Sequence, residues 1–347
     1  MATMNINDQS QPMRPISRRR MLGIAGCAAG LAAGGGGLAA LLRTDATPSG
    51  PGYRWRGVVL GAPASIVIAH HDRAAARRVV ADCLAEIARC ERIFSLYRPD
   101  SALTALNRDG ALGNPPGDLL ALLSVARRVH GASRGAFDPT LQPLWRLYAD
   151  HFARMPDDRT GPGAKTIAAV MTRIGFDKVA IEADRIALRP GMALTLNGIA
   201  QGFIADRVAA VMRAGGIADT LIDLGEIRAL GRHQSGRAWR AGIRAPGEPG
   251  RLLSTVELVN TALATSGDDG TQFDAAGRFG HILDPRTGKP ARANRSASVR
   301  APTAALADAL STALFVMPAA EGFKLVRDFK DAEALVQPRN GRLRGWA

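Results

Sequence analysis

The segment 304–317 carries the residues whose types and spacing point most directly to chemistry. It holds Asp308 and Thr312 in a run that is otherwise Ala, Leu, Ser, Phe, Val and Met. This composition predicts a helix buried on all sides, on which residues four apart share one face. A buried carboxylate is costly unless it is paired, hydrogen-bonded or bound to metal, and with a hydroxyl it offers two oxygens to Mg²⁺. A capping role for Asp308, with Thr312 bonding back to its own helix, explains the pair equally well.

Three further segments combine turn residues with groups that could act on a ligand. In the stretch 280–290, His281 precedes an Asp-Pro turn and could serve as a general base, although a lone histidine is more often structural. The stretch 196–203 is a strand-to-helix turn in which Gly198 lets the backbone approach a ligand closely, and a helix N-terminus suits phosphate. The stretch 136–140 (Ala-Phe-Asp-Pro-Thr) is of the same kind. Each is also explained as an ordinary tight turn.

The elements that must position these groups mix helices with short strands. Asp72 is placed to cap a long amphipathic helix, and further helices are expected near 118–130, 204–214 and 304–317. Strands are expected at 58–69 (a pair or a bent strand), 181–188, 193–196, 220–224, 239–243 and 255–259. This pattern predicts an α+β fold. No glycine-rich phosphate loop of the Rossmann or Walker type occurs, which disfavours those nucleotide-binding folds.

The N-terminus has the features of an export signal. Arg18 and Arg19 precede the uncharged, Ala/Gly-rich stretch 23–42, which is typical of a twin-arginine signal. Four consecutive glycines at 34–37 make the stretch a poor membrane span. The sequence therefore predicts a signal or anchor over 1–45, a linker over 46–57 and one domain over 58–347, working in the periplasm. Whether the signal is cleaved or retained as an inner-membrane anchor is left open.

Charge and cysteine content exclude two other classes. The chain has 45 Lys and Arg against 31 Asp and Glu among 347 residues, a net charge of +14. The arginines are scattered rather than clustered between aromatics, so we expect no nucleic-acid partner. Three cysteines are too few for a disulfide framework.

Taken together and in order, these segments resemble the FAD:protein FMN transferase (ApbE-like) family. The matching pieces are 94–108, 135–144, 196–206, 221–231, 262–267, 281–290 and 301–317. The resemblance implies two similar α+β halves with the flavin nucleotide site between them. It also implies a Mg²⁺-dependent reaction in which FAD is cleaved at its pyrophosphate and AMP leaves. FMN is then attached to a Thr or Ser hydroxyl of an exported acceptor flavoprotein, or of a flavin-carrying subunit of a membrane redox system.

The resemblance assigns roles to individual residues. His281 takes the place of the base that activates the acceptor hydroxyl, and the Mg²⁺ ligands are Asp308, Thr312 and the carbonyl of Gly198. Contacts to FAD are implied for Leu60, Tyr97, Ala136, Phe137, Asp138, Thr195, Gln201 and Ile282.

The sequence departs from the family pattern at four positions, two of which lose negative charge near the cation. Thr195 stands where Asp is frequent, and Gln201 where Lys or Glu is frequent. The pair Gly225-Glu226 replaces a common Gly-Gly, and Ser311 replaces an acid that is often a further ligand. Losing acids at 195 and 311 should weaken Mg²⁺ binding without abolishing it. These losses also motivate two alternatives: an FAD-binding protein without transfer, and an FAD pyrophosphatase that gives FMN and AMP.

Overall fold

The computed structural model describes residues 53–59, 62–70 and 72–346. Within these ranges no helix has the length and the apolar run that a membrane crossing requires. The predicted signal, over 1–45, lies outside the described residues, as does Leu60. The first strand begins at Tyr53, inside the stretch 46–57 that the sequence suggested as a linker.

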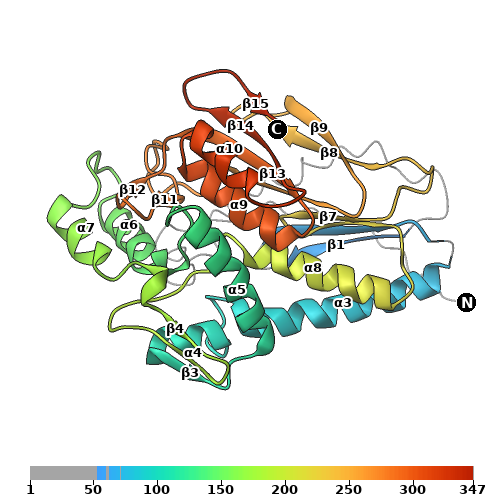
Figure 1. Cartoon of the computed structure of the whole chain (residues 1–347), viewed down its shortest axis with the longest axis horizontal. Helices are drawn as coiled ribbons and strands as arrows, with labels where there is room; N and C mark the ends of the chain where they lie inside the picture. Colours follow the sequence, from blue (N-terminus) through green and yellow to red (C-terminus); the bar gives the residue numbers. More distant parts are fainter. Residues whose placement is uncertain (1–52, 60–61, 71, 347) are drawn as a thin grey trace, which may run out of the picture.

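One antiparallel sheet of eight strands forms the centre of the molecule (Figure 1). In sheet order the strands are β1 (Tyr53–Val59), β2 (Ala62–Ile68), β6 (Thr220–Asp223), β7 (Ile227–Leu230), β10 (Ala262–Gly267), β13 (Asn294–Ala301), β14 (Glu333–Pro338) and β15 (Arg344–Gly345). At the middle of this sheet β7 pairs with β10. Antiparallel strands with segregated helices confirm the predicted α+β class.

Four helices pack on one face of this sheet: α3 (Arg73–Phe94), α8 (Ala200–Ala214), α9 (Ala304–Val316) and α10 (Ala319–Arg327). Two more, α4 (Ala102–Asp109) and α5 (Gly117–Ala132), pack on these helices. The main core lies between the helices and the sheet, and α9 is buried nearly all round, as its composition predicts. α8 packs on β6 and β7, whereas α9 packs on β10 and β13. These two helices therefore cross the centre of the sheet side by side.

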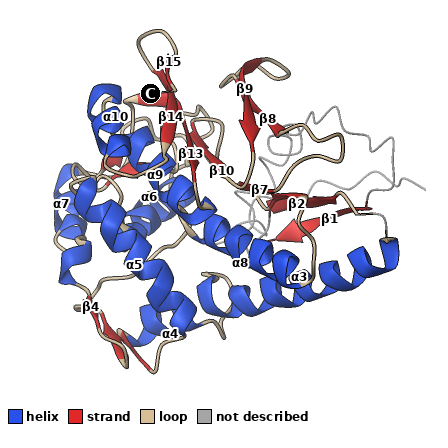
Figure 2. Ribbon diagram, turned by 45° about the vertical axis from the view of Figure 1, so that its right-hand side comes forward, coloured by secondary structure: helices blue, strands red, loops and turns tan. Residues whose placement is uncertain are grey.

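The opposite face carries the hairpin of β8 (Trp239–Arg244) and β9 (Leu252–Leu258), as Figure 2 shows. A second, smaller core fills the space between this hairpin and the sheet, with Trp239 fully packed in it. A short three-stranded sheet of β3 (Ala111–Gly113), β5 (Arg185–Ala187) and β4 (Ala180–Ile181) lies beside α4.

A third packed region supports the segment that carries His281. It comprises α6 (Gln142–Arg154), α7 (Ala164–Met171) and the short strands β11 (Leu283–Asp284) and β12 (Lys289–Pro290). Two 3₁₀ turns, at Pro139–Leu141 and Phe176–Lys178, complete the described elements. Tyr148 of α6 stacks on Phe273, and its hydroxyl donates to the Gly288 carbonyl at 3.0 Å. Phe152 packs against Phe279. Aromatic contacts from α6 thus fix the loop before His281, and the Tyr148 hydrogen bond fixes the chain after it.

The segment 193–196, which we expected to be a strand, forms none. Its backbone amides and carbonyls form hydrogen bonds with groups outside any sheet. The amide of Leu194 donates to the Asn107 side chain and its carbonyl accepts from that side chain, at 2.6 and 2.8 Å, while the Thr195 amide donates to the Pro139 carbonyl at 2.7 Å. A side-chain amide and a loop carbonyl therefore replace a strand partner.

Candidate active site

Asp308 lies where α9 crosses the start of α8. Its residue is 4% exposed, and its carboxylate accepts a hydrogen bond from the Gly202 amide at 3.2 Å. That amide belongs to the first turn of α8, where backbone donors have no partner within the helix. Gly202 is required for this approach, because a Cβ there would lie 2.2 Å from the Ala304 carbonyl oxygen. The close helix crossing is what brings the carboxylate to the helix N-terminus.

Thr312 lies one turn further along α9 and faces the turn that precedes α8. A Cβ on Gly198 would stand 2.9 Å from the Thr312 hydroxyl and 3.4 Å from the Phe137 ring. The backbone of Gly198 is therefore packed between these two side chains. The structure thus brings together Gly198, Thr312 and Phe137, with Asp308 on the same helix as Thr312.

Two further buried carboxylates lie in this region: Glu226, which interacts with Asp308, and Asp223, which interacts with Glu226. Glu226 and Asp223 flank the β6–β7 turn, and each is only 9% exposed. Burial raises the pKa of Glu226, and the negative charges of Asp308 and Asp223 raise it further. Burial also raises the pKa of Asp308, against the lowering effect of the Gly202 amide, and raises that of Asp223 to about 6. No arginine or lysine within the described residues forms an ion pair with any of the three.

The turn that carries these acids contacts the start of α8 directly. Gly225 has a φ of +102°, a conformation that favours glycine, and a Cβ there would lie 2.8 Å from the Gln201 amide nitrogen. Sequence reasoning noted Glu226 only as a departure from a Gly-Gly pair and did not single out Asp223. The available signal was an acid at the end of the strand expected over 220–224.

The donor set fits Mg²⁺. A carboxylate, a hydroxyl and a nearby backbone carbonyl are hard oxygen ligands, and Mg²⁺ is commonly held by one or two carboxylates completed by water and substrate phosphates. Within the described residues, no three His, Cys, Asp or Glu side chains are placed to hold one ion between them. The site therefore suits a mixed oxygen set on Asp308, Thr312 and Gly198. Ser311, where the resemblance led us to expect an acid, instead donates to the Asp308 carbonyl at 3.0 Å.

His281 lies in the loop held by α6. Its Nδ1 is 2.9 Å from the Thr271 carbonyl oxygen, and its ring packs so closely on Gly270 that a Cβ there would be 2.2 Å from Cε1. A carbonyl only accepts, so Nδ1 carries the proton and Nε2 keeps its lone pair. Burial lowers the pKa of His281, although the Thr271 carbonyl opposes this shift. The neutral, proton-accepting form is thus favoured. No hydrogen bond or ion pair within the described residues joins His281 to Asp308 or Thr312.

The remaining predicted FAD contacts divide into two groups. Tyr97 is 39% exposed, so part of its ring is open to a ligand. Asp138 is buried, and its carboxylate accepts from the Thr140 amide and hydroxyl at 2.8 and 2.6 Å and from the Phe176 amide at 3.1 Å. Asp138 therefore holds the loop that presents Ala136 and Phe137.

Comparisons with known proteins bear on the whole domain. The model of the ApbE family matches residues 60–336. A FAD:protein FMN transferase of Treponema pallidum is 34% identical over 281 residues, covering 74% of this chain and 76% of that protein. An ApbE protein from Thermotoga maritima has a structure similar to this one, with a TM-score of 0.75 and 27% identity, covering 84% of this chain and 96% of that chain. The Pseudomonas stutzeri flavinyl transferase ApbE gives a TM-score of 0.72 at 28% identity, covering 84% and 92%. The chain belongs to the ApbE family.

Proposed function

We propose that this protein transfers FMN from FAD to a hydroxyl of an acceptor protein in a Mg²⁺-dependent reaction that releases AMP. The observation that carries the proposal is the Asp308 carboxylate. It is buried, has no cationic partner within the described residues, and lies beside an uncharged oxygen set on Thr312 and Gly198. Curated relatives carry the name FAD:protein FMN transferase, which supports the same activity.

His281 supplies the base in this proposal. An unassisted Thr or Ser hydroxyl is a poor nucleophile, and a positioned base contributes about 10²–10⁴-fold to the rate. His281 Nε2 takes the hydroxyl proton while the hydroxyl oxygen forms a bond to the phosphorus of the FMN half. The bond from that phosphorus to the bridging oxygen breaks, and the oxygen leaves with AMP. The Thr271 carbonyl holds the ring in the tautomer that this step needs.

The other residues bind and orient the nucleotide. Tyr97 offers a partly open ring to a flat ligand, and Phe137 lies against the Gly198 backbone at the oxygen cluster. Asp308, Thr312 and the Gly198 carbonyl would hold Mg²⁺, which supplies neutralisation of the pyrophosphate charge. The Gly202 amide in the first turn of α8 donates to Asp308 and so holds this carboxylate in place.

The test is incubation with FAD, Mg²⁺ and a candidate acceptor domain, followed by intact-mass measurement. An added FMN mass on the acceptor, together with AMP, is the expected result. AMP without added mass would identify a pyrophosphatase. Bound FAD with no AMP would identify a binding protein. Either result would contradict the proposal.

We also propose that the protein acts in the periplasm after export by the twin-arginine route. The support is the Arg18-Arg19 pair ahead of an uncharged Ala/Gly-rich stretch. Replacing both arginines by lysine should leave precursor in the cytoplasm. Undiminished appearance of the protein in the periplasm would show that another route operates.

A further inference from the structure

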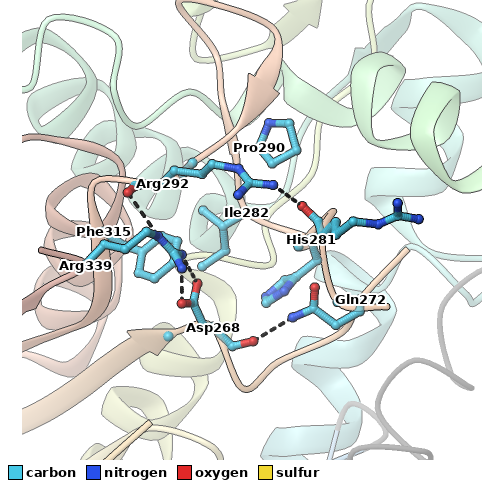
Figure 3. Close-up of a pocket in the computed structure, with 13 residues that line it drawn as sticks. Asp268, Gln272, His281, Ile282, Pro290, Arg292, Phe315 and Arg339 are labelled. Atoms are coloured by element: carbon cyan, nitrogen blue, oxygen red, sulfur yellow. Dashed lines mark hydrogen bonds and ion pairs between the residues drawn. The ribbon is translucent and has the colours of Figure 1, made fainter. Parts of the chain in front are cut away.

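A small polar cavity opens beside His281 (Figure 3). Its volume is about 110 Å³, and its charged and polar lining comprises Asp268, Gln272, Arg278, His281, Arg292 and Arg339. Pockets that hold drug-sized ligands measure roughly 300–1,000 Å³. The cavity is therefore sized for one side chain rather than for a dinucleotide.

Arg292 is the arginine of this cavity that has no acidic partner within the described residues. Arg339 contacts both carboxylate oxygens of Asp268, at 2.9 and 2.8 Å, and Arg278 pairs with Asp274 at 3.0 Å. Arg292, by contrast, donates to the Arg278 carbonyl at 2.5 Å. Figure 3 shows its side chain extending across the cavity toward that loop. A guanidinium has donors left over after one such bond, so Arg292 offers an unneutralised, forked donor group to an anion.

The position of the cavity indicates which kind of anion Arg292 would bind. Among the described residues predicted to contact FAD, Ile282 alone lines it, while Tyr97, Phe137 and Gln201 do not. His281 lines it too, and under the proposed function His281 receives the proton of the acceptor hydroxyl. An acceptor segment placed with its hydroxyl at His281 therefore has its neighbouring residues at this cavity.

We propose that the cavity is a subsite for the acceptor protein, in which Arg292 binds a carboxylate side chain close in sequence to the modified Thr or Ser. This inference rests on the proposed function. Guanidinium and carboxylate match in geometry and charge, and a pair at an interface rim mainly sets partner choice and salt dependence.

The test uses synthetic peptides that contain one threonine among alanine and glycine, with Asp, Asn or Lys placed at one flanking position at a time. Binding to the FAD- and Mg²⁺-loaded protein is measured by fluorescence anisotropy of labelled peptide, and FMN transfer by intact mass. At one flanking position the wild-type protein should prefer Asp over Asn by about tenfold in binding and in KM. Arg292→Ala should remove the preference, and Arg292→Glu should reverse it in favour of Lys. A loss of loop structure cannot reverse a charge preference.

Two controls complete the test. Arg240→Ala changes an exposed arginine of β8, away from the cavity, and should keep the preference for Asp. FAD affinity should be unchanged in Arg292→Ala; a loss of FAD affinity with the peptide preference intact would assign the cavity to nucleotide phosphate and overturn the inference. Transfer without any charge preference would also overturn it while upholding the proposed function. Charge-selective binding without transfer would uphold the subsite and overturn the function, and failure of both would overturn both.

Discussion

Two aspartates at the crossing of α8 and α9 have the same local role but opposite surroundings. Asp206 of α8 accepts from the Ala304 and Ala305 amides at the start of α9, both at 2.9 Å. Asp308 of α9 accepts from the Gly202 amide at the start of α8. Each helix thus places a carboxylate at the N-terminus of the other, where the helix dipole favours negative charge.

The two aspartates differ in the charged side chain that lies beside each of them. Asp206 forms an ion pair with the buried Arg228, at 3.1 Å from Nε. Asp308 instead lies near Glu226, whose pKa is raised by Asp308 and by Asp223, so its charged neighbour is an acid rather than a cation. A buried carboxylate with a fixed cation is complete within the fold. One that faces a further acid is neutralised either by a proton or by a cation from outside, and we therefore place Mg²⁺ at Asp308 and not at Asp206.

The largest effect is expected from Asp308→Asn. Removing the charged ligand should lower FMN transfer by about 10³-fold or more, since a bound metal contributes several kcal/mol of charge stabilisation to such a transition state. The metal-free variant should remain folded and be at least as stable as the wild type at pH 8, because a buried, repelled charge has been removed. Transfer kinetics with limiting Mg²⁺ and thermal unfolding check the two parts. Wild-type transfer by the variant would show that Asp308 holds no metal.

Thr312→Val is the matched milder change. It removes one neutral oxygen from the same face of α9 while it keeps the volume of the side chain. The apparent Mg²⁺ affinity should fall, with less loss of rate at saturating Mg²⁺ than in Asp308→Asn. Equal effects of the two changes would mean that packing at this face, and not charge, controls the reaction.

The second prediction extends the comparison to His281, a half-buried base that forms no ion pair within the described residues. His281→Ala should reduce transfer by roughly two orders of magnitude or more and change FAD affinity by only a few-fold, because a base acts on the proton-transfer step. Flavin fluorescence and single-turnover transfer measure the two quantities. Parallel losses in both would leave His281 structural, and Asp284 would be the next base to test.

The pH dependence of the rate follows from the same group. Only neutral imidazole accepts the proton, so the rate should fall as pH drops through the pKa of His281. Because burial lowers that pKa, the half-maximal rate should lie below pH 6.5. The unfolded chain binds this proton more readily than the folded chain, so His281 also lowers stability as pH falls from about 6.5. An inflection above pH 7 that disappears in His281→Ala would contradict the lowered pKa.

Third, Asp206→Ala should damage stability rather than chemistry. The change leaves the Arg228 guanidinium buried without its acidic partner and the first amides of α9 without an acceptor, and breaking a buried pair costs about 3–5 kcal/mol. Since the Asp206 side chain is 22% exposed, we expect the lower end of that range. Denaturant unfolding measures the loss, and transfer at a temperature where the variant is folded should stay within about tenfold of the wild type. A stable but inactive variant would remove the distinction between the two aspartates.

The sequence was sufficient to predict half of this comparison. The α+β class, the buried helix 304–316 and the pairing of Asp308 with Thr312 follow from composition and helical spacing, and the family resemblance added the roles. Asp206, Arg228 and Asp223 were not predicted as partners, because their significance depends on the helix crossing at Gly202 and on the β6–β7 turn, which are contacts between distant parts of the chain. The absent strand at 193–196 has the same origin, since a side chain 87 positions away takes its hydrogen bonds.

The smallest effect, and the most specific, is expected from Glu226→Gln. Glu226 supplies buried negative charge near Asp308 without being placed as one of three clustered ligands. Its folded-state pKa is raised, so its contribution to stability is complete below its unfolded value near 4.5 and is lost as pH rises. At pH 8 without metal the variant should therefore melt roughly 2 °C or more above the wild type, and the difference should shrink toward pH 5.

A nearby buried charge contributes on the order of 1 kcal/mol to cation binding, so Mn²⁺ affinity, measured by electron paramagnetic resonance, should fall about fivefold. A variant that is more stable without metal and also binds Mn²⁺ more weakly would show that Glu226 and Asp308 repel each other in the metal-free protein and that a bound cation removes this repulsion. Unchanged Mn²⁺ affinity would mean that Glu226 does not contribute to cation binding. The difference between Asp206 and Asp308 would then be only that Asp206 has Arg228 as a partner.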